Sequence, residues 1–523
     1  MPRFFNTAGP CDPARHYTLP PERRLPGVRQ LIDQQLYFVI HAPRQVGKTT
    51  CFRTLAQRLT ASGRYVAVHT SCETGQAARS DVEAGVAAVL TSLALDATDQ
   101  LQHLDAALLP PAADVTVGAE GRLQELLGRW SQRSPLPVIV FFDEIDALFD
   151  DVLISVLRQL RAGYVRRPGQ FPQSVALIGL RDVRDYKASL RPDGATLGTS
   201  SPFNVKVRSL TIRNFNEAEV AELYGQHTAE SGQSFTPEAL ALAFALTDGQ
   251  PWLVNALADT LVRDLVPDRA TTITDAHMNQ AKEALIARRD THLDSLIDRL
   301  REDRVRRVIE PMLAGQLVLG ERIDDDIAFV EDLGLVKRTG GHLVIANAIY
   351  QEVIPRALAS ITQYTIPHHT AWYLDGDGRL MMRALLEGFV GFWREHGDAL
   401  LAHQPYHEIA PHLVLMAFLQ RVVNGGGFID REYAVGAGRL DLCVRWPWSG
   451  GVDLHALELK VRTDKKNPLA EGLDQLAGYL RRLDLDHGTL IIFDRRTNAP
   501  PVDERGEVQQ EVHDGLNITI LWL

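Results

Sequence analysis

Short apolar runs alternate with longer amphipathic segments over the first part of the chain. Four of these runs have the length and composition of buried strands, and they lie at residues 36–42, 64–70, 135–143 and 174–180. The segments between them show the spacing of apolar residues that is typical of helices. Because buried strands that alternate with helices are typical of a parallel sheet, we predict an α/β fold here.

The pattern changes further along the chain. Helical segments alone follow from about residue 213, and residues 301–360 show short helices and then two strands across a Gly-Gly turn, the outline of a winged helix. Residues 366–523 return to α/β. A chain of 523 residues has room for three to four domains. We predict an α/β core at 1–212, a helical domain at 213–300, the winged helix at 301–360 and a second α/β domain at 366–523.

Composition excludes several classes of protein. The net charge of −11 excludes a surface that binds nucleic acid everywhere, so any such binding is local. The four cysteines are scattered without metal-ligand spacing, which argues against a disulfide framework and a zinc site. The start of the chain has no signal-peptide core, and the longest apolar runs are too short to cross a bilayer. We therefore expect a cytoplasmic protein that does not bind membranes.

The first chemical motif follows the first predicted strand. Its sequence, HAPRQVGKTT, opens a helix, which is the context that a phosphate-binding loop requires. We expect its backbone N–H groups and the helix N-terminus to surround the phosphates of a nucleotide. In this interpretation Lys48 reaches the β- and γ-phosphates, Thr49 offers its hydroxyl to Mg²⁺, and Ala42 stands where the usual pattern has glycine. The candidate nucleotide-binding residues of the loop are Pro43, Arg44, Gln45, Val46, Gly47, Lys48, Thr49 and Thr50.

The second motif is the pair Asp143-Glu144 at the end of the third apolar strand. A strand buried on both faces ends in carboxylates when they meet a cation or solvent at the carboxyl edge of the sheet. We expect Asp143 to hold Mg²⁺ through water and Glu144 to polarise the attacking water. No NKxD motif for guanine is present, so the two motifs together predict ATP as the ligand and ATP hydrolysis as the reaction.

These motifs resemble those of a prokaryotic family of AAA-like ATPases. The resemblance covers roughly residues 1–360 and is carried by FFNTAGP, HAPRQVGKTT, IGLRDVRDY, SPFN and GQPWLVNALA. It implies the signal-transducing branch of the AAA+ ATPases, with a helical lid, a winged helix and a domain arrangement that nucleotide state controls. Arg181 and Asp182 stand where related ATPases place a sensor of the γ-phosphate, although a surface loop with salt bridges explains them equally well. The segment around Pro251 is better explained as a helix start than as a nucleotide contact.

A further group of charged residues lies on two predicted strands near the C-terminus. Glu458 and Lys460 are two residues apart on the apolar strand ALELKV, so both face one side of it. Burying such a pair without a partner is costly, and a divalent metal held by Asp441 and Glu458 supplies one. Lys460 is then placed to orient or deprotonate the attacking water and to stabilise charge on a phosphate.

This group resembles the PD-(D/E)XK nuclease superfamily over about residues 380–498, with GRLD in place of PD. Gln475 and Tyr479 match the QxxxY feature of its exonuclease-like branch, and Glu408 corresponds to an acidic residue from the domain's first helix. The resemblance implies DNA as substrate and Mg²⁺ or Mn²⁺ as the metal. The residues that it assigns to catalysis or to the metal are Glu408, Asp441, Glu458 and Lys460.

Together the motifs predict an ATP-dependent switch that controls a C-terminal metal-dependent DNA nuclease, with a role in prokaryotic defence. In the alternative, the nuclease-like domain or the winged helix only binds nucleic acid or a protein partner. Residues 366–523 carry 16 Lys and Arg against 22 Asp and Glu, so we expect weak DNA binding through local clusters. These candidates are Lys465, Lys466, Arg495 and Arg496, with Arg304, Arg306, Arg307 and Arg338 of the winged helix. A homo-oligomer or an activating partner stays open.

Overall fold

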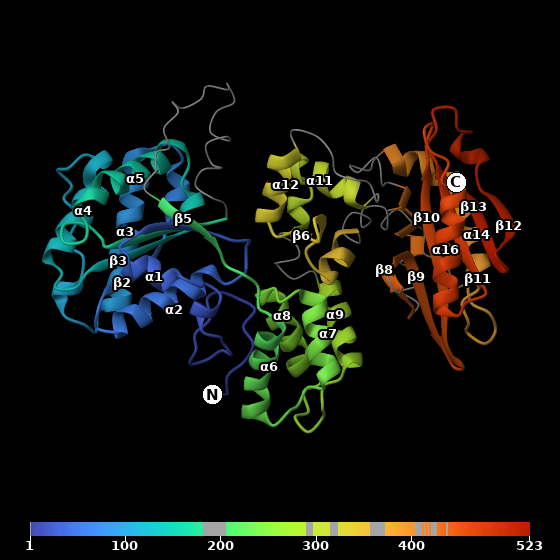
Figure 1. The fold of residues 1–523 in the computed structure, drawn as a ribbon, viewed down its shortest axis with the longest axis horizontal. Helices are drawn as coiled ribbons and strands as arrows, with labels where there is room; N and C mark the ends of the chain where they lie inside the picture. Colours follow the sequence, from blue (N-terminus) through green and yellow to red (C-terminus); the bar gives the residue numbers. More distant parts are fainter. Residues whose placement is uncertain are drawn as a thin grey trace. The chain divides into compact units, whose positions relative to one another are not determined.

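The chain forms two compact units in the computed structural model. The first unit comprises Met1–His292 with Ile327–Ala348, and the second comprises Leu293–Asp326 with Ile349–Leu523 (Figure 1). The structure describes residues 2–180, 206–288, 296–313, 323–355, 372–402, 411–412, 414–416, 418–419, 426–435 and 438–523. In these ranges no helix combines the length and the apolar character needed to cross a membrane.

A five-stranded parallel sheet forms the centre of the first unit. Its strands are β1 (Tyr37–His41), β2 (Val66–Ser71), β3 (Val138–Asp143), β4 (Ser174–Gly179) and β5 (Lys206–Thr211), in the order β2-β3-β4-β1-β5. The strands β1 to β4 coincide with the four predicted runs, so the parallel α/β fold is confirmed. The sequence analysis does not predict β5, because its residues are mostly polar and form no continuous apolar run.

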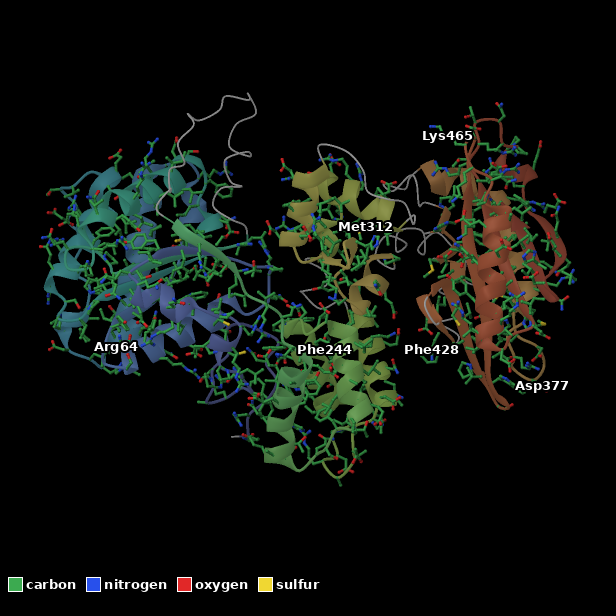
Figure 2. The ribbon with its side chains drawn as sticks, in the orientation of Figure 1. Arg64, Phe244, Met312, Asp377, Phe428 and Lys465 are labelled. Carbon is green, nitrogen blue, oxygen red and sulfur yellow. The ribbon has the colours of Figure 1, made fainter. Side chains whose placement is uncertain are left out.

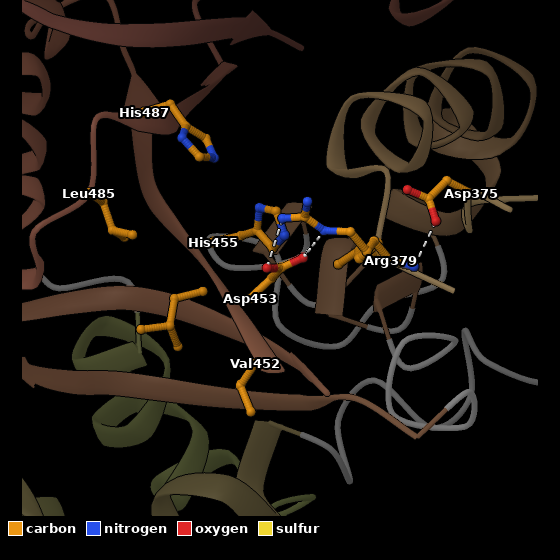
Figure 3. A pocket seen from close by; sticks show the side chains of 9 residues that line it. Asp375, Arg379, Val452, Asp453, His455, Leu485 and His487 are labelled. Atoms are coloured by element: carbon orange, nitrogen blue, oxygen red, sulfur yellow. Dashed lines mark hydrogen bonds and ion pairs between the residues drawn. The ribbon is translucent and has the colours of Figure 1, made fainter. Parts of the chain in front are cut away.

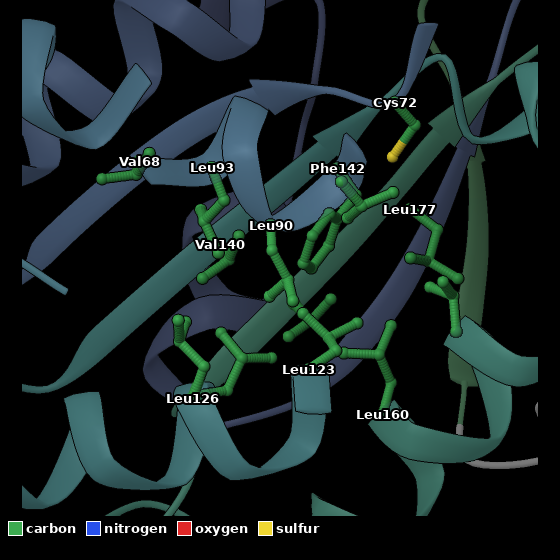
Figure 4. Packing of buried hydrophobic residues seen from close by; sticks show 14 of the residues in the cluster. Val68, Cys72, Leu90, Leu93, Leu123, Leu126, Val140, Phe142, Leu160 and Leu177 are labelled. Carbon is green, nitrogen blue, oxygen red and sulfur yellow. The ribbon is translucent and has the colours of Figure 1, made fainter. Parts of the chain in front are cut away.

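Helices cover both faces of this sheet, and each face has its own core. The helices are α1 (Val28–Asp33), α2 (Lys48–Ala61), α3 (Val82–Leu101), α4 (Ala119–Arg133) and α5 (Asp150–Gly163). The larger core joins leucines of α3, α4 and α5 to one face of the sheet. Figure 4 shows Leu90, Leu93, Leu123, Leu126 and Leu160 around Val68, Val140, Phe142 and Leu177. The smaller core places α1 and α2 on the other face. Burial on both faces explains why these strands have no polar side.

Helices follow the sheet in the chain, as predicted. They are α6 (Glu217–Ser231), α7 (Pro237–Thr247), α8 (Pro251–Asp259), a π-helical turn at Thr260–Leu265, and α9 (Asp275–Arg288). Next come α11 (Asp303–Leu313), α12 (Ile323–Asp332) and the antiparallel pair β6 (Val336–Thr339) and β7 (His342–Ile345), joined through Gly340 and Gly341 with φ of 58° and 83°. This is the predicted order of short helices and a hairpin. The boundary between the two units crosses α12, and the four-domain division stays a prediction.

The second unit contains a mixed six-stranded sheet in the order β12-β13-β11-β10-β9-β8. Its strands are β8 (Phe428–Val435), β9 (Gly438–Trp448), β10 (Gly451–Arg462), β11 (His487–Asp494), β12 (Glu507–His513) and β13 (Leu516–Trp522). The strands β10, β11 and β13 are parallel, and the remaining pairs are antiparallel. Helix α16 (Leu469–Leu483) packs on one face of the sheet, and α14 (Met382–Ala402) packs on the other. The described residues from 372 onward therefore form helices and a mixed sheet, and the boundary at residue 366 stays a prediction.

Candidate nucleotide site and carboxylate–lysine site

The predicted phosphate loop joins β1 to α2. Helix α2 begins at Lys48, and Gly47 is its N-cap with φ of 82°. The Lys48 ammonium donates hydrogen bonds to the carbonyl oxygens of Ala42 at 2.7 Å and Pro43 at 2.8 Å. Ala42 is not among the described residues with positive φ, so its methyl group fits where the usual motif has glycine. The lysine thus lies across the loop that it is predicted to serve.

The remaining residues of the loop differ in exposure. Val46 is buried, whereas Arg44 and Gln45 are exposed, and Gln45 has a φ of 58°. The hydroxyl oxygen of Thr50 accepts a hydrogen bond from the backbone N–H of Cys11 at 3.0 Å. The segment near the N-terminus therefore contacts the first turn of α2.

A buried arginine supports the loop from behind, and sequence reasoning missed it. Arg24 is 4% exposed and donates to the carbonyl oxygens of Val46 at 2.7 Å and Arg213 at 2.8 Å. Its guanidinium lies 4.8 Å from the ring centre of Phe215, and burial lowers its pKa. Arg24 therefore links the phosphate loop to the segment that follows β5.

The two predicted magnesium residues meet although 94 positions separate them. The Thr49 hydroxyl donates to Asp143 Oδ2 at 2.7 Å, and the His69 Nε2–H donates to the same oxygen at 3.0 Å. Burial alone would raise the pKa of Asp143, but the His69 hydrogen bond, Thr49 and the Lys48 charge hold it below the usual range. An ionised carboxylate and a hydroxyl are hard oxygen donors, so Thr49 and Asp143 fit Mg²⁺.

The predicted catalytic Glu144 stands directly after β3 in a left-handed conformation, with φ of 53°. Its Oε2 accepts a hydrogen bond from the Ser71 hydroxyl at 2.7 Å. Burial raises the pKa of Glu144, and the nearby acidic groups add to the shift. Ser71 ends β2, so the neighbouring strand positions this carboxylate.

The turn between α7 and α8 also reaches the phosphate loop. Gln250 is the N-cap of α8 and accepts from the Leu253 N–H at 2.6 Å, which agrees with a helix start. Its Nε2 also donates to the carbonyl oxygen of Gln45 at 3.4 Å. The candidate sensors Arg181 and Asp182 lie outside the described residues.

The carboxylate–lysine group is brought together on β9 and β10. The pairing of Leu442 with Leu457 places Asp441 beside Glu458 in the next position. The Lys460 ammonium donates to Glu458 Oε1 at 2.6 Å, and Asp441 Oδ2 accepts from the Leu459 N–H at 2.8 Å. The three predicted residues therefore lie at one place in the sheet.

Charge is unbalanced at this place. Glu458 is 2% exposed. Burial and the Asp441 charge raise its pKa, and together they outweigh Lys460, which lowers it. Burial alone would lower the pKa of Lys460, but the two carboxylates raise it. Two carboxylates that share one lysine fit a divalent cation as a further positive charge.

The third predicted metal ligand, Glu408, lies outside the described residues. Within them, no group of three or more His, Cys, Asp or Glu residues is placed to hold a metal ion. Gln475 is exposed, and Tyr479 is half-buried against the core below α16. The metal site and the QxxxY assignment stay predictions.

Acidic residues pair with most of the predicted basic clusters. Asp326 binds Arg304 and Arg307, each at 2.7 Å. The other pairs are Arg306–Asp303 at 2.8 Å, Arg338–Glu331 at 3.0 Å, Lys466–Glu471 at 2.8 Å and Arg496–Asp494 at 2.6 Å. Lys465 is exposed on the loop after β10 (Figure 2). These pairs reduce the positive charge that a nucleic acid would meet.

A pocket of about 380 Å³ lies near the start of β10, away from the predicted residues (Figure 3). Arg379 donates to both oxygens of Asp453, at 2.9 and 3.0 Å. Burial lowers the pKa of His455 to about 4, and its ring nitrogens have no hydrogen-bond partner among the described residues. His455 is an odd number of positions from Glu458, so it faces the opposite side of β10. The pocket is therefore separate from the carboxylate–lysine group.

The strand order, the loop after β1 and the acidic end of β3 are the arrangement of a P-loop NTPase core. No model of a known protein family matches this chain, and no curated protein matches it. Several solved structures do. A Walker-type ATPase of Pyrococcus abyssi is 14% identical, with 67% of this chain and 99% of that chain covered and a TM-score of 0.47.

Two further solved structures are similar over the same part of the chain. RuvB of Thermotoga maritima, a Holliday junction branch migration motor, is 12% identical, with 64% of this chain and 92% of that chain covered and a TM-score of 0.34. Cdc6p from Pyrobaculum aerophilum is 12% identical, with 66% and 94% covered and a TM-score of 0.34. With TM-scores below 0.5, these likenesses carry no argument about residues or activity.

Proposed function

We propose that the first unit binds ATP with Mg²⁺ and hydrolyses it. The observation that carries this proposal is the hydrogen bond from Thr49 to Asp143, beside Lys48 at the start of α2. It joins the two motifs that the sequence predicts separately, at the carboxyl edge of a parallel sheet. Such an edge is where nucleotides bind in open α/β sheets.

The roles of the residues follow from their positions. Lys48 exchanges its two carbonyl partners for phosphate oxygens, and the N–H groups at the start of α2 stabilise the negative charge. Thr49 and Asp143 would hold Mg²⁺, and the ion would supply positive charge against the phosphates of the nucleotide. The Glu144 carboxylate first gives up its hydrogen bond with the Ser71 hydroxyl. It then orients the attacking water and accepts a proton from that water.

Replacing Lys48 by Ala tests the ATP site. We expect the variant to lose the rise in melting temperature that ATP with Mg²⁺ gives the wild-type chain. Lys465→Ala removes the same kind of charge from an exposed loop of the second unit, so it is the matched control and should keep the rise. An undiminished rise in Lys48→Ala would refute the assignment of the phosphate loop.

We further propose that Asp441, Glu458 and Lys460 hydrolyse phosphodiester bonds of DNA with Mg²⁺ or Mn²⁺, under control of the nucleotide state of the first unit. Asp441 and Glu458 would hold the metal, and Lys460 would orient the attacking water and stabilise the charge on the phosphate. A role in prokaryotic defence rests on the pairing of the two predicted activities. The support is the shared position of the three side chains on β9 and β10.

Incubation with linear and circular DNA tests this activity, with Mg²⁺ or Mn²⁺ and with or without ATP. Cleavage should disappear in Glu458→Gln and persist in Glu511→Gln, a matched change at an exposed position of β12. Cleavage that survives Glu458→Gln would place the activity elsewhere. Dependence on ATP would show the direction of the coupling.

The ion pairs of the predicted basic clusters weaken the case for DNA as the substrate and leave room for a second candidate function. In it, the nuclease-like domain or the winged helix binds nucleic acid or a protein partner, and no DNA is cleaved. Binding of duplex DNA or of a partner, with no cleavage under any metal or nucleotide condition, would support this alternative. Measuring the mass of the purified protein in solution tests whether the chain forms a homo-oligomer.

A further inference from the structure

His69 lies where the neighbouring strand reaches the magnesium carboxylate. It stands on β2, two positions before Ser71, and Ser71 is in register with Asp143. Its side chain is buried, with 6% of the residue exposed, and its Nε2–H lies 3.0 Å from Asp143 Oδ2. Sequence reasoning gave this histidine no role, because a single histidine in the apolar strand RYVAVHT carries no motif.

The backbone of His69 is also hydrogen-bonded to a side chain. Strand β2 is an edge of the sheet, so on one side its backbone groups have no neighbouring strand. The Gln100 side chain of α3 fills that place, because its Nε2 donates to the His69 carbonyl at 2.7 Å and its Oε1 accepts from the His69 N–H at 3.1 Å. The pair of bonds fixes the position of His69 along the strand.

The carboxylate of Asp143 is oriented from three directions. Oδ1 accepts from the Glu144 N–H at 2.9 Å, and Oδ2 accepts from Thr49 and His69. Thr49 lies in the first turn of α2, directly after the phosphate loop, and would give its hydroxyl to Mg²⁺ in the proposed ATP site. His69 belongs to the central sheet, so its hydrogen bond does not depend on the state of the loop.

We propose that His69 is a positioning residue for magnesium: it keeps the Asp143 carboxylate turned toward the metal site whether or not the loop is occupied. This inference rests on the ATP site proposed above. Side chains that hydrogen-bond a metal ligand typically change metal affinity by about 10–100-fold when they are removed. A histidine that only fills the core would leave the metal affinity unchanged.

The variants His69→Gln and His69→Met test this role. Both side chains have the same length, but only Gln has an N–H that can reach Asp143 in place of the imidazole. Nucleotide binding is measured with a fluorescent ATP analogue, first in EDTA and then in a Mg²⁺ titration. The melting temperature of each chain without ligands reports its folding.

We expect His69→Met to bind the analogue in EDTA as the wild-type chain does, and to need about 10–100-fold more Mg²⁺ for half of the magnesium effect on binding. His69→Gln should stay close to the wild type. Equal magnesium requirements in the Met and Gln variants would overturn the inference. A wild-type chain that binds no nucleotide under any condition would instead refute the proposed function.

Gln100→Met provides a second variant if His69→Met does not fold. It removes both hydrogen bonds to the His69 backbone and leaves the imidazole present. We expect a smaller rise in the magnesium requirement, of several-fold, with binding in EDTA unchanged. A requirement equal to that of the wild type would also count against a positioning role for His69.

Discussion

Replacing Gly249 by Ala should disturb the turn that connects the helices after β5 to the phosphate loop. Gly249 lies between α7 and α8, just before Gln250, and its φ is +67°. A Cβ atom there would lie 1.8 Å from the carbonyl oxygen of Phe215 and 2.7 Å from its carbonyl carbon. These are backbone atoms, so the clash cannot be relieved by a side-chain rotation. Either the turn or the segment after β5 must move.

The structure also offers a matched position from which to work out the magnitude. Gly232 ends α6 with a φ of +77°, and a Cβ atom there would have nothing within 4 Å. An L-residue in the left-handed region costs about 1–2 kcal/mol, which both positions share. Overpacking adds about 1–3 kcal/mol at Gly249 alone. We therefore expect Gly249→Ala to lower the free energy of unfolding by about 2–5 kcal/mol and Gly232→Ala by about 1–2 kcal/mol.

Urea unfolding of the full chain, followed by tryptophan fluorescence, measures both variants. Trp252 is 7% exposed and three positions from Gly249, so it is one of the seven tryptophans whose emission should change when the first unit unfolds. The midpoint should fall about 1.5 to 4 times as far in Gly249→Ala as in Gly232→Ala. ATP affinity should also fall in Gly249→Ala, because Gln250 shifts relative to Gln45. Equal losses of stability in the two variants would refute the argument from the Phe215 contact.

Three further predictions concern the proposed sites. Glu144→Gln should keep ATP binding but slow phosphate release by about 10²–10⁴-fold, and unchanged turnover would mean that another residue positions the water. Lys460→Arg should abolish DNA cleavage although the positive charge remains, because the wide, planar guanidinium cannot take the place of a compact ammonium beside Glu458; full cleavage would contradict that role. Arg24→Leu should lower the free energy of unfolding by about 2–5 kcal/mol, because it removes the donor of the buried Val46 carbonyl and of the partly buried Arg213 carbonyl. An unchanged urea midpoint would argue against this support of the loop.

The first four strands of the first sheet could be predicted because burial on both faces leaves a continuous apolar run. The strand β5 could not, since it lies at the edge of the sheet and its visible side chains are partly or wholly exposed. The residues of the motifs could likewise be predicted, whereas the residues that hold the motifs in place could not. Lys48 and Asp143 belong to patterns with fixed spacing, whereas Arg24 in PERRL resembles an ordinary surface arginine until tertiary structure buries it. Side chains that act across the fold leave no local signal.

The carboxylate–lysine group could be predicted only in part from the sequence. Alternation along one strand predicts that Glu458 and Lys460 share a side. The position of Asp441 beside them depends on the pairing of two strands, which spacing alone does not determine. Gly472 of α16 adds a contact that no motif contains, because a Cβ atom there would lie 2.8 Å from Leu490 and 3.3 Å from Lys460. A side chain at this position would therefore press on Leu490 and, less strongly, on Lys460.

The buried carboxylates Asp143 and Glu458 differ in the positive charges and hydrogen-bond donors that surround them. Asp143 accepts hydrogen bonds from His69 and Thr49 and lies near Lys48, and these partners lower its pKa against the effect of burial. Among the described residues, Glu458 has Lys460 and a long hydrogen bond from the Asp441 N–H, which do not offset burial and the Asp441 charge, so its pKa is raised. The first arrangement keeps its carboxylate ionised with groups of the chain alone, whereas the second gains most from a divalent cation. Added Mg²⁺ or Mn²⁺ without nucleotide should therefore stabilise the second unit more than the first, and Glu458→Gln should remove that difference.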